Sequence, residues 1–184
     1  MSRNRFDEVY DWAGLRVADY VRAHYDTAAR IMDVGAGQGK YRLLLRDYPD
    51  FDACEVWEPT AREEHLDELY RHVFVRDFVD LTATTWWSDG RYDLVIMGDV
   101  LEHMSVTDAQ LVLLRTRSFG ADVVVVVPYD YPQDEEGGNV YQRHIQDDLT
   151  PELMAATYPS LRLIALETRD HRPFKGIYVG SKDG

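Results

Sequence analysis

The stretch IMDVGAGQGK, which spans residues 31–40, decides how this chain is expected to fold. Its apolar start is typical of a buried strand, and its alternating glycines, Gly35, Gly37 and Gly39, let the backbone turn sharply. Glycines at such a turn also allow a ligand to lie against bare main chain, with the N–H groups of the following helix pointing at it. The stretch therefore predicts a strand, a ligand-binding loop and a helix in succession.

Two common phosphate-binding loops do not match this stretch. A P-loop needs Gly-x-x-x-x-Gly-Lys followed by Ser or Thr, but Val34 stands at the first glycine position and Tyr41 replaces the hydroxyl residue. The dinucleotide fingerprint Gly-x-Gly-x-x-Gly would require its third glycine at Lys40, one residue after Gly39. The loop reads Gly-x-Gly-x-Gly instead, and an acidic residue, Asp33, precedes it.

Strand-like and helix-like segments alternate on both sides of the loop. Apolar residues recur at helical spacing from Phe6 to Val21, and Thr150 followed by Pro151 marks the start of a later helix. Further helices are expected at 40–47, 60–70 and 106–117, and the expected strands are 29–34, 53–57, 72–76, 92–97, 121–127, 161–167 and 174–180. This order predicts a doubly wound α/β fold: a Rossmann-like seven-stranded sheet, mostly parallel, with one antiparallel strand near the C-terminus and helices on both faces.

The length and the charge of the chain narrow its class. We expect 184 residues, 45% of them hydrophobic, to form a single domain over residues 1–184. Within it, a helical cap is expected at 1–27 and the core fold at 28–180. The 33 acidic residues exceed the 20 Lys and Arg residues and give a formal charge of −13. This balance makes nucleic acid an unlikely partner, because phosphate neutralisation needs clustered Lys and Arg.

The compartment is expected to be the cytoplasm. The chain has one cysteine, Cys54, so it can form no intrachain disulfide and no site with several cysteine ligands. Acidic residues stand at positions 7 and 8, where a signal peptide would need an apolar segment. The longest aliphatic run, residues 123–127, is far shorter than the roughly 20 residues that span a bilayer. We therefore expect no membrane partner, and the sequence leaves the oligomeric state open.

With its glycine loop and alternating order, the chain resembles the class I S-adenosylmethionine-dependent methyltransferases. Their first motif, an acidic residue, a spacer and Gly-x-Gly-x-Gly, matches residues 33–39, and the resemblance extends over about residues 28–180. It implies S-adenosyl-L-methionine as the cofactor and acidic residues at the ends of successive strands. The cofactor-binding residues that it implies are Asp33, Gly35, Gly37, Gly39, Glu58 at the ribose, Asp77 and Phe78 near the adenine, and Asp99 after the fourth strand.

The chemistry of this cofactor agrees with such a set of acids. A carboxylate can accept hydrogen bonds from both ribose hydroxyls, and carboxylates also suit the cationic sulfonium and the ammonium group. Ligands of open α/β sheets bind at the carboxyl ends of the parallel strands, where these acids are expected to gather. One acid alone could be a solvated loop residue, whereas a series after successive strands indicates a site.

The acceptor of the methyl group is expected next to the loops that follow strands four and five. His103 and His144 come from these loops and are the candidate catalytic residues, since a general base would be needed for an acceptor hydroxyl. A structural role that bonds a neighbouring loop is the favoured interpretation for His103, and it is an equal alternative for His144. The connection 129–149, with several tyrosines and two adjacent glycines, is the expected lid over the acceptor.

We therefore expect a methyltransferase that acts on an oxygen or nitrogen of a small molecule, such as a sugar or a natural-product intermediate. One alternative is a metal-assisted RNA 2′-O-methyltransferase, because Asp99, Glu102, His103 and His144 resemble the metal-binding set of those enzymes. Since Asp99 replaces the first Glu of that set, we expect no metal. The other alternative is a non-catalytic protein that binds S-adenosylmethionine for regulation or assembly.

Overall fold

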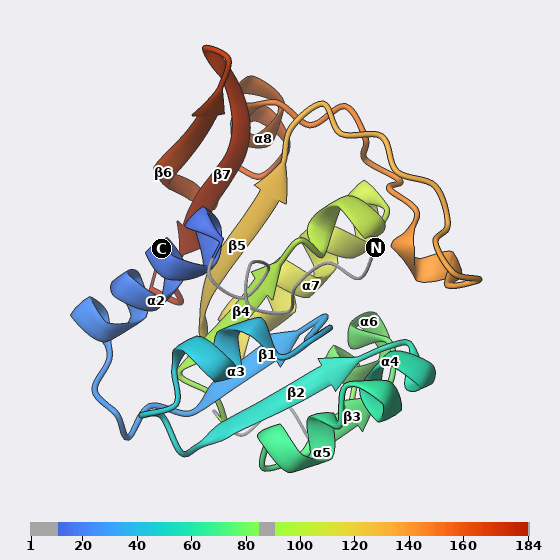
Figure 1. The fold of residues 1–184 in the computed structure, drawn as a ribbon. Helices are drawn as coiled ribbons and strands as arrows, with labels where there is room; N and C mark the ends of the chain where they lie inside the picture. Colours follow the sequence, from blue (N-terminus) through green and yellow to red (C-terminus); the bar gives the residue numbers. More distant parts are fainter. Residues whose placement is uncertain (1–10, 85–90, 184) are drawn as a thin grey trace.

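A computed structural model describes residues 11–84 and 91–183, which build one seven-stranded sheet (Figure 1). The strand order is β3-β2-β1-β4-β5-β7-β6, and β7 runs antiparallel to both of its neighbours while the other adjacent strands are parallel. This confirms the predicted sheet. The strands are β1 Ile31–Val34, β2 Phe51–Glu55, β3 Val73–Val75, β4 Leu94–Gly98, β5 Asp122–Pro128, β6 Arg162–Arg169 and β7 Arg172–Gly180.

Helices cover both faces of this sheet, and each face has its own apolar core. Alternate side chains of a strand point to opposite faces, so Ile31 belongs to one core and Met32 to the other. One core contains residues of α2 Trp12–His24, α3 Lys40–Leu44, α4 Glu58–Glu63 and α5 Leu66–Leu69. The other contains residues of α6 Phe78–Thr82, α7 Val106–Ser118 and α8 Pro151–Thr157. Within the described residues, no helix is both long enough and apolar enough to cross a bilayer.

Local chemistry accounts for several of these elements. The Thr150 side chain accepts a hydrogen bond from the Leu153 N–H, and Pro151 takes the first turn of α8, as the sequence predicts. Ser105 caps α7 in the same way. In β5 the five valines 123–127 are fully buried, because helices or neighbouring segments cover the strand on both faces.

The second strand and the helix after it differ from the sequence prediction. The strand runs from Phe51 to Glu55 instead of from residue 53 to 57, and its five residues are buried whereas residues 56 and 57 are only half-buried. The helix expected at 60–70 is two short helices that join at His65, whose backbone has a left-handed φ of 52°. Thr60 is not a cap, since the first of these helices, α4, already begins at Glu58.

Two further differences from the sequence prediction lie on either side of this region. The sequence did not predict α6, which the side chain of Asp77 caps at its first turn. The first helix, α2, begins at Trp12 behind its cap Asp11; the part of the predicted helix at residues 6–10 lies outside the described residues, as does the stretch with Trp86 and Trp87.

Candidate functional site

Two joined cavities lie at the carboxyl ends of the parallel strands. Cavity A, of about 580 Å³, extends from the glycine loop to the C-terminal strand β7. Cavity B, of about 470 Å³, extends from the same loop to the ends of β2 and β3. Both cavities are lined by Gly35, Gly37, Asp99, His103 and Gln142, which therefore form the junction between them. This is the edge at which open α/β sheets bind ligands.

The glycine loop crosses the junction with its backbone in the left-handed region. Gly35 has a φ of 66°, and a Cβ atom at that position would lie 2.6 Å from a methyl group of Val100. The N–H of Gly37 donates to the Glu55 carboxylate at 3.1 Å, so the end of β2 holds the loop in place. The loop thus has both the conformation and the close packing that require glycine.

Asp33, which precedes the loop, does not line either cavity. It lies in β1 with 1% of its surface exposed and accepts a 2.5 Å hydrogen bond from the Tyr70 hydroxyl. Burial raises the pKa of Asp33 to about 7, although the Tyr70 hydrogen bond and the Lys40 charge oppose this effect. Its second carboxylate oxygen, Oδ1, has no hydrogen-bond partner. The structure therefore places Asp33 in the buried strand β1, paired with Tyr70, and not among the lining residues.

Glu58, the acid expected at the ribose, lies away from both cavities. Its side chain is 63% exposed and forms an ion pair with Arg62 one turn later in α4. Glu55 lines cavity B instead, where its carboxylate accepts hydrogen bonds from the N–H groups of Gly37 and Trp57. The difference follows from the end of β2, because the last residue of the strand is the one that points across the loop.

Asp77 and Phe78 line cavity B, as expected for residues after the third strand. The Asp77 carboxylate accepts a 2.8 Å hydrogen bond from the Val79 N–H, which fixes its orientation at the start of α6. Phe78 is 3% exposed and forms part of the core beneath the cavity. The structure thus brings Asp77, Phe78 and Glu55 together around one cavity.

Asp99 lies at the junction between two lysines. Its carboxylate accepts a 2.7 Å hydrogen bond from the Lys175 ammonium, and the Lys40 ammonium lies 3.6 Å away. Burial alone would raise the pKa of Asp99, but the charges of Lys175 and Lys40 hold it below its usual value. The sequence analysis did not assign either lysine to the site. The position of Lys40, directly after the glycine loop, was the only local indication that it lies near the ligand site.

The two candidate histidines lie together with Glu102. The rings of His103 and His144 are 4.6 Å apart between centroids, and one nitrogen of each ring and a Glu102 oxygen lie within 4.8 Å of one another. Nδ1 of His103 lies 3.1 Å from the Arg143 carbonyl, and Nδ1 of His144 lies 2.6 Å from the Tyr131 carbonyl. A carbonyl can only accept, so Nδ1 carries the hydrogen and, in the neutral ring, Nε2 keeps the lone pair.

Glu102 is fully buried, and neither of its carboxylate oxygens has a hydrogen-bond partner. Burial and the neighbouring Asp99 raise the pKa of Glu102 well above its usual value. Burial also lowers the pKa of His103, which favours the neutral ring. All three residues line cavity A, where the Glu102 carboxyl group, without a hydrogen-bond partner, lies beside the two imidazole rings.

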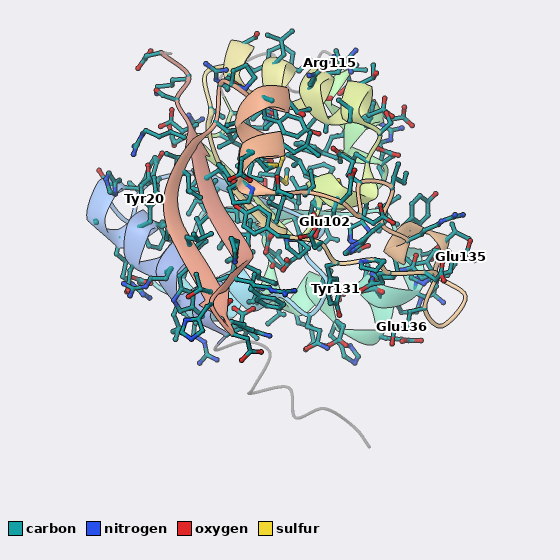
Figure 2. All side chains as sticks on the ribbon, turned by 90° about the horizontal axis from the view of Figure 1, so that it is seen from above. Tyr20, Glu102, Arg115, Tyr131, Glu135 and Glu136 are labelled. Carbon is teal, nitrogen blue, oxygen red and sulfur yellow. The ribbon has the colours of Figure 1, made fainter. Side chains whose placement is uncertain are left out.

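The connection 129–149 borders both cavities. Tyr131 and Gln133 line cavity A, and Tyr141 and Ile145 line cavity B, where the Tyr141 ring lies 6.2 Å from the ring of Trp57. Figure 2 shows Glu102 and Tyr131 toward the centre of the view, with Glu135 and Glu136 farther out along the connection. This segment is thus positioned to contact ligands in both cavities.

Comparison with known proteins identifies the fold. No family model and no curated protein sequence matches the chain. The methyltransferase domain of bacterial CtHen1 aligns with a TM-score of 0.66 and 17% identity over 94% of this chain and 99% of that chain. Magnesium protoporphyrin IX methyltransferase from Synechocystis PCC 6803, with bound SAM, aligns with a TM-score of 0.60 and 16% identity over 98% and 86%. The N-terminal domain of EvdMO1, with SAH bound, gives 0.60 and 18% over 89% and 80%.

The architecture is therefore that of the class I S-adenosylmethionine-dependent methyltransferases. Its sheet order, its terminal antiparallel strand and its glycine loop after β1 all belong to that fold. At this level of identity the likeness defines the fold alone. The argument for a ligand site and its chemistry rests on the residues of this chain.

Proposed function

We propose that the chain is an S-adenosylmethionine-dependent methyltransferase that transfers a methyl group to an oxygen or nitrogen of a small molecule. The observation that carries this proposal is the joining of two cavities at the glycine loop. Cavity B is lined by Glu55, Asp77 and Phe78, and cavity A by polar and aromatic side chains of the connection 129–149. A donor and an acceptor can thus occupy adjacent spaces that meet at Asp99.

In this proposal, cavity B holds the adenosine part of the cofactor. The Glu55 carboxylate would accept hydrogen bonds from the ribose hydroxyls while it continues to hold the Gly37 N–H. Asp77 would accept from the adenine amino group beside Phe78. The cofactor supplies an electrophilic methyl group on a cationic sulfur, and the residues at the junction would align it with the acceptor and exclude water.

His144 is the residue that we propose as general base for a hydroxyl acceptor. Its Nδ1 donates to the Tyr131 carbonyl, so the ring is oriented and Nε2 is the nitrogen that can take a proton. His103, whose Nδ1 donates to the Arg143 carbonyl, would hold the connection in place next to it. An amine acceptor in its neutral form would need less help from such a base.

The first experiment is calorimetry with S-adenosylhomocysteine, for which we expect one binding site per chain. Absence of binding at millimolar ligand would contradict the cofactor proposal. Transfer of a labelled methyl group to a small-molecule extract, compared with transfer to total small RNA, then tests the acceptor class. We expect label in the small-molecule fraction, and His144→Ala should slow that transfer about 100-fold while leaving S-adenosylhomocysteine affinity nearly unchanged.

One observation favours a second candidate, the metal-assisted RNA 2′-O-methyltransferase. Glu102, His103 and His144 offer one nitrogen of each imidazole ring and a buried carboxyl group without hydrogen bonds, all within 4.8 Å of one another, which fits a divalent ion with nitrogen and oxygen ligands. The hydrogen bonds from both Nδ1 atoms to carbonyl oxygens would orient the rings for such an ion. When bound, the ion would supply Lewis-acid activation of a hydroxyl beside cavity A.

This second candidate is tested by titrating the chelator-treated protein with Mn²⁺, Co²⁺ and Zn²⁺. One ion bound per chain, lost in Glu102→Gln and kept in the control His65→Ala, would support it. His65 is a matched control because it is an exposed histidine paired with an acidic residue, Glu68, away from the site. Equal binding by both variants would contradict the metal site, and methylation of RNA only with the ion present would favour this candidate over the small-molecule acceptor.

A further inference from the structure

The chain has few lysines, and most of them lie at one point of the structure. The sequence contains 17 arginines and three lysines, at positions 40, 175 and 182. Two of the three, Lys40 and Lys175, contact the same carboxylate, that of Asp99. Arginine presents a broad planar fork, whereas lysine presents a compact point charge. The chain therefore uses its rare compact cation at the junction of the two cavities.

The three side chains come from distant parts of the sequence. Lys40 opens α3 directly after the glycine loop, and Lys175 lies on β7, opposite Pro128 of β5. Their side chains are 19% and 17% exposed, so water screens these charges only in part. Asp99 itself has a left-handed φ of 56°, a conformation that non-glycine residues rarely adopt and that often marks a functional position.

The charges at this point balance. Lys40 also contacts Asp11 at 3.3 Å, so the ion pairs among the described residues join two ammonium and two carboxylate groups, whose charges sum to zero. Removal of the Lys175 charge would leave Asp99 and Asp11 with one lysine between them, and the junction would become negative. Asp99 lines both cavities, so this change in net charge would occur where the donor and the acceptor would meet.

We propose that Lys175 is a positioning residue that neutralises the charge of Asp99. The site would therefore bind the charged sulfonium and the uncharged thioether of the cofactor with similar affinity. This inference rests on the proposed function. The donor carries a positive sulfonium, and this charge disappears as the methyl group leaves. A carboxylate left unneutralised beside the sulfur would stabilise the charged ground state more than the transition state, in which that charge is already decreasing. It would therefore strengthen binding of the donor and raise the barrier to methyl transfer.

The test compares the affinity for S-adenosylmethionine with that for S-adenosylhomocysteine, because the two ligands differ only in the methyl group and its charge. Calorimetry on the wild type should give dissociation constants within a few-fold of each other. In Lys175→Met the ratio of affinities should shift toward S-adenosylmethionine by about five- to tenfold. This is the effect expected when the Asp99 carboxylate is no longer neutralised by Lys175 in a partly screened site. In Asp99→Asn the preference should shift in the opposite direction, because two lysines then remain with one carboxylate.

Two controls separate charge from packing. Lys175→Arg keeps the charge and should keep the wild-type preference. Lys182→Met removes an exposed lysine that lines neither cavity and should change nothing. Equal weakening of both ligands in Lys175→Met, or a shift of the same sign in Asp99→Asn, would overturn the inference while leaving the proposed function intact. If the wild type bound neither ligand, the proposed function itself would fail.

Discussion

A buried acid with one hydroxyl donor lies directly before the glycine loop. Asp33 is enclosed in β1, and the Tyr70 hydroxyl is its hydrogen-bond donor. Because burial disfavours the charged form, its pKa rises to about 7 from an ordinary value of 3.8. Over the pH range between these two pKa values, Asp33 is protonated in the folded chain and ionised in the unfolded chain. The free energy of unfolding therefore depends on pH through this residue.

The pH dependence has a definite sign. Between about pH 4 and pH 7 the folded chain binds the Asp33 proton and the unfolded chain does not, so stability falls as pH rises through this range. Asp33→Asn should remove this loss, with a gain over wild type of about 2 kcal/mol at pH 5 that grows to at most about 4 kcal/mol at pH 8. Urea unfolding of both proteins at several pH values measures it; a difference independent of pH would contradict the assignment.

A second prediction at this scale separates two acids near the end of β2. Glu55 lines cavity B and Glu58 is exposed in α4, so Glu55→Gln should weaken S-adenosylhomocysteine binding at least about tenfold, because a charged acceptor is lost at the ribose. Glu58→Gln is the matched control and should change affinity less than twofold. Calorimetry decides between them, and the reverse order of effects would restore Glu58 as the ribose acid.

At the scale of elements, the Gln146 side chain makes three of the hydrogen bonds that hold the connection 129–149 at the site. Gln146 is 7% exposed and donates from Nε2 to the carbonyls of Leu101 and Met104, while its Oε1 accepts from the Tyr158 hydroxyl of the α8 end. The N–H groups of Ile145 and Gln146 also donate to the Glu102 carbonyl. The connection is thus tied to the same short segment that carries Glu102 and His103.

Loss of the Gln146 hydrogen bonds should lower the stability of the fold measurably. Gln146→Leu removes a donor from the Leu101 carbonyl, which keeps the Met104 N–H, and takes the Gln146 partner from the Met104 carbonyl and the Tyr158 hydroxyl. This should cost about 3 kcal/mol and lower the melting temperature by about 6–12 °C. Limited proteolysis should then cut within 130–145 more rapidly than in wild type. Gln110→Leu, whose side chain makes one exposed hydrogen bond to the Thr157 carbonyl, is the control. Similar effects of the two substitutions would argue against a special role for Gln146.

For the whole molecule, the important feature is that both cavities lie at one edge of the sheet. The lining residues come from the loops after β1, β2, β3 and β4, from β7 and from the connection 129–149. A ligand in these cavities therefore contacts elements from both halves of the sheet and both apolar cores. Such a ligand stabilises the folded chain as a unit.

Bound cofactor product should raise the melting temperature. S-adenosylhomocysteine at about 100 times its dissociation constant should add about 2.7 kcal/mol to stability, which corresponds to about 5–11 °C for a domain of this size. Adenosine monophosphate at the same concentration is the control, since it has the adenosine but lacks the thioether and the amino-acid end. A shift no larger than that of the control would indicate that only the adenosine part is recognised.

Much of the fold is encoded over short stretches, and these the sequence predicts well. The glycine loop, the Thr150 cap and the buried valines of β5 each depend on neighbouring residues, through turn conformation, capping or periodicity. The seven strands and the antiparallel end of the sheet follow from their order. Strand ends are less well determined: the expected strand ends two residues beyond Glu55, and the acid that follows it, Glu58, lies outside both cavities, whereas Glu55 lines cavity B.

By itself, then, the sequence determined the class of fold, the glycine loop and the edge of the sheet at which a ligand would bind. Only the tertiary structure decided which side chains meet there: Lys175 reaches Asp99 across 76 positions of the chain, and His144 lies against His103. The physical reason is the range of the interactions. Turns and caps form among residues a few positions apart, whereas these contacts exist only because β7 inserts beside β5 and the connection 129–149 folds back over the strand ends.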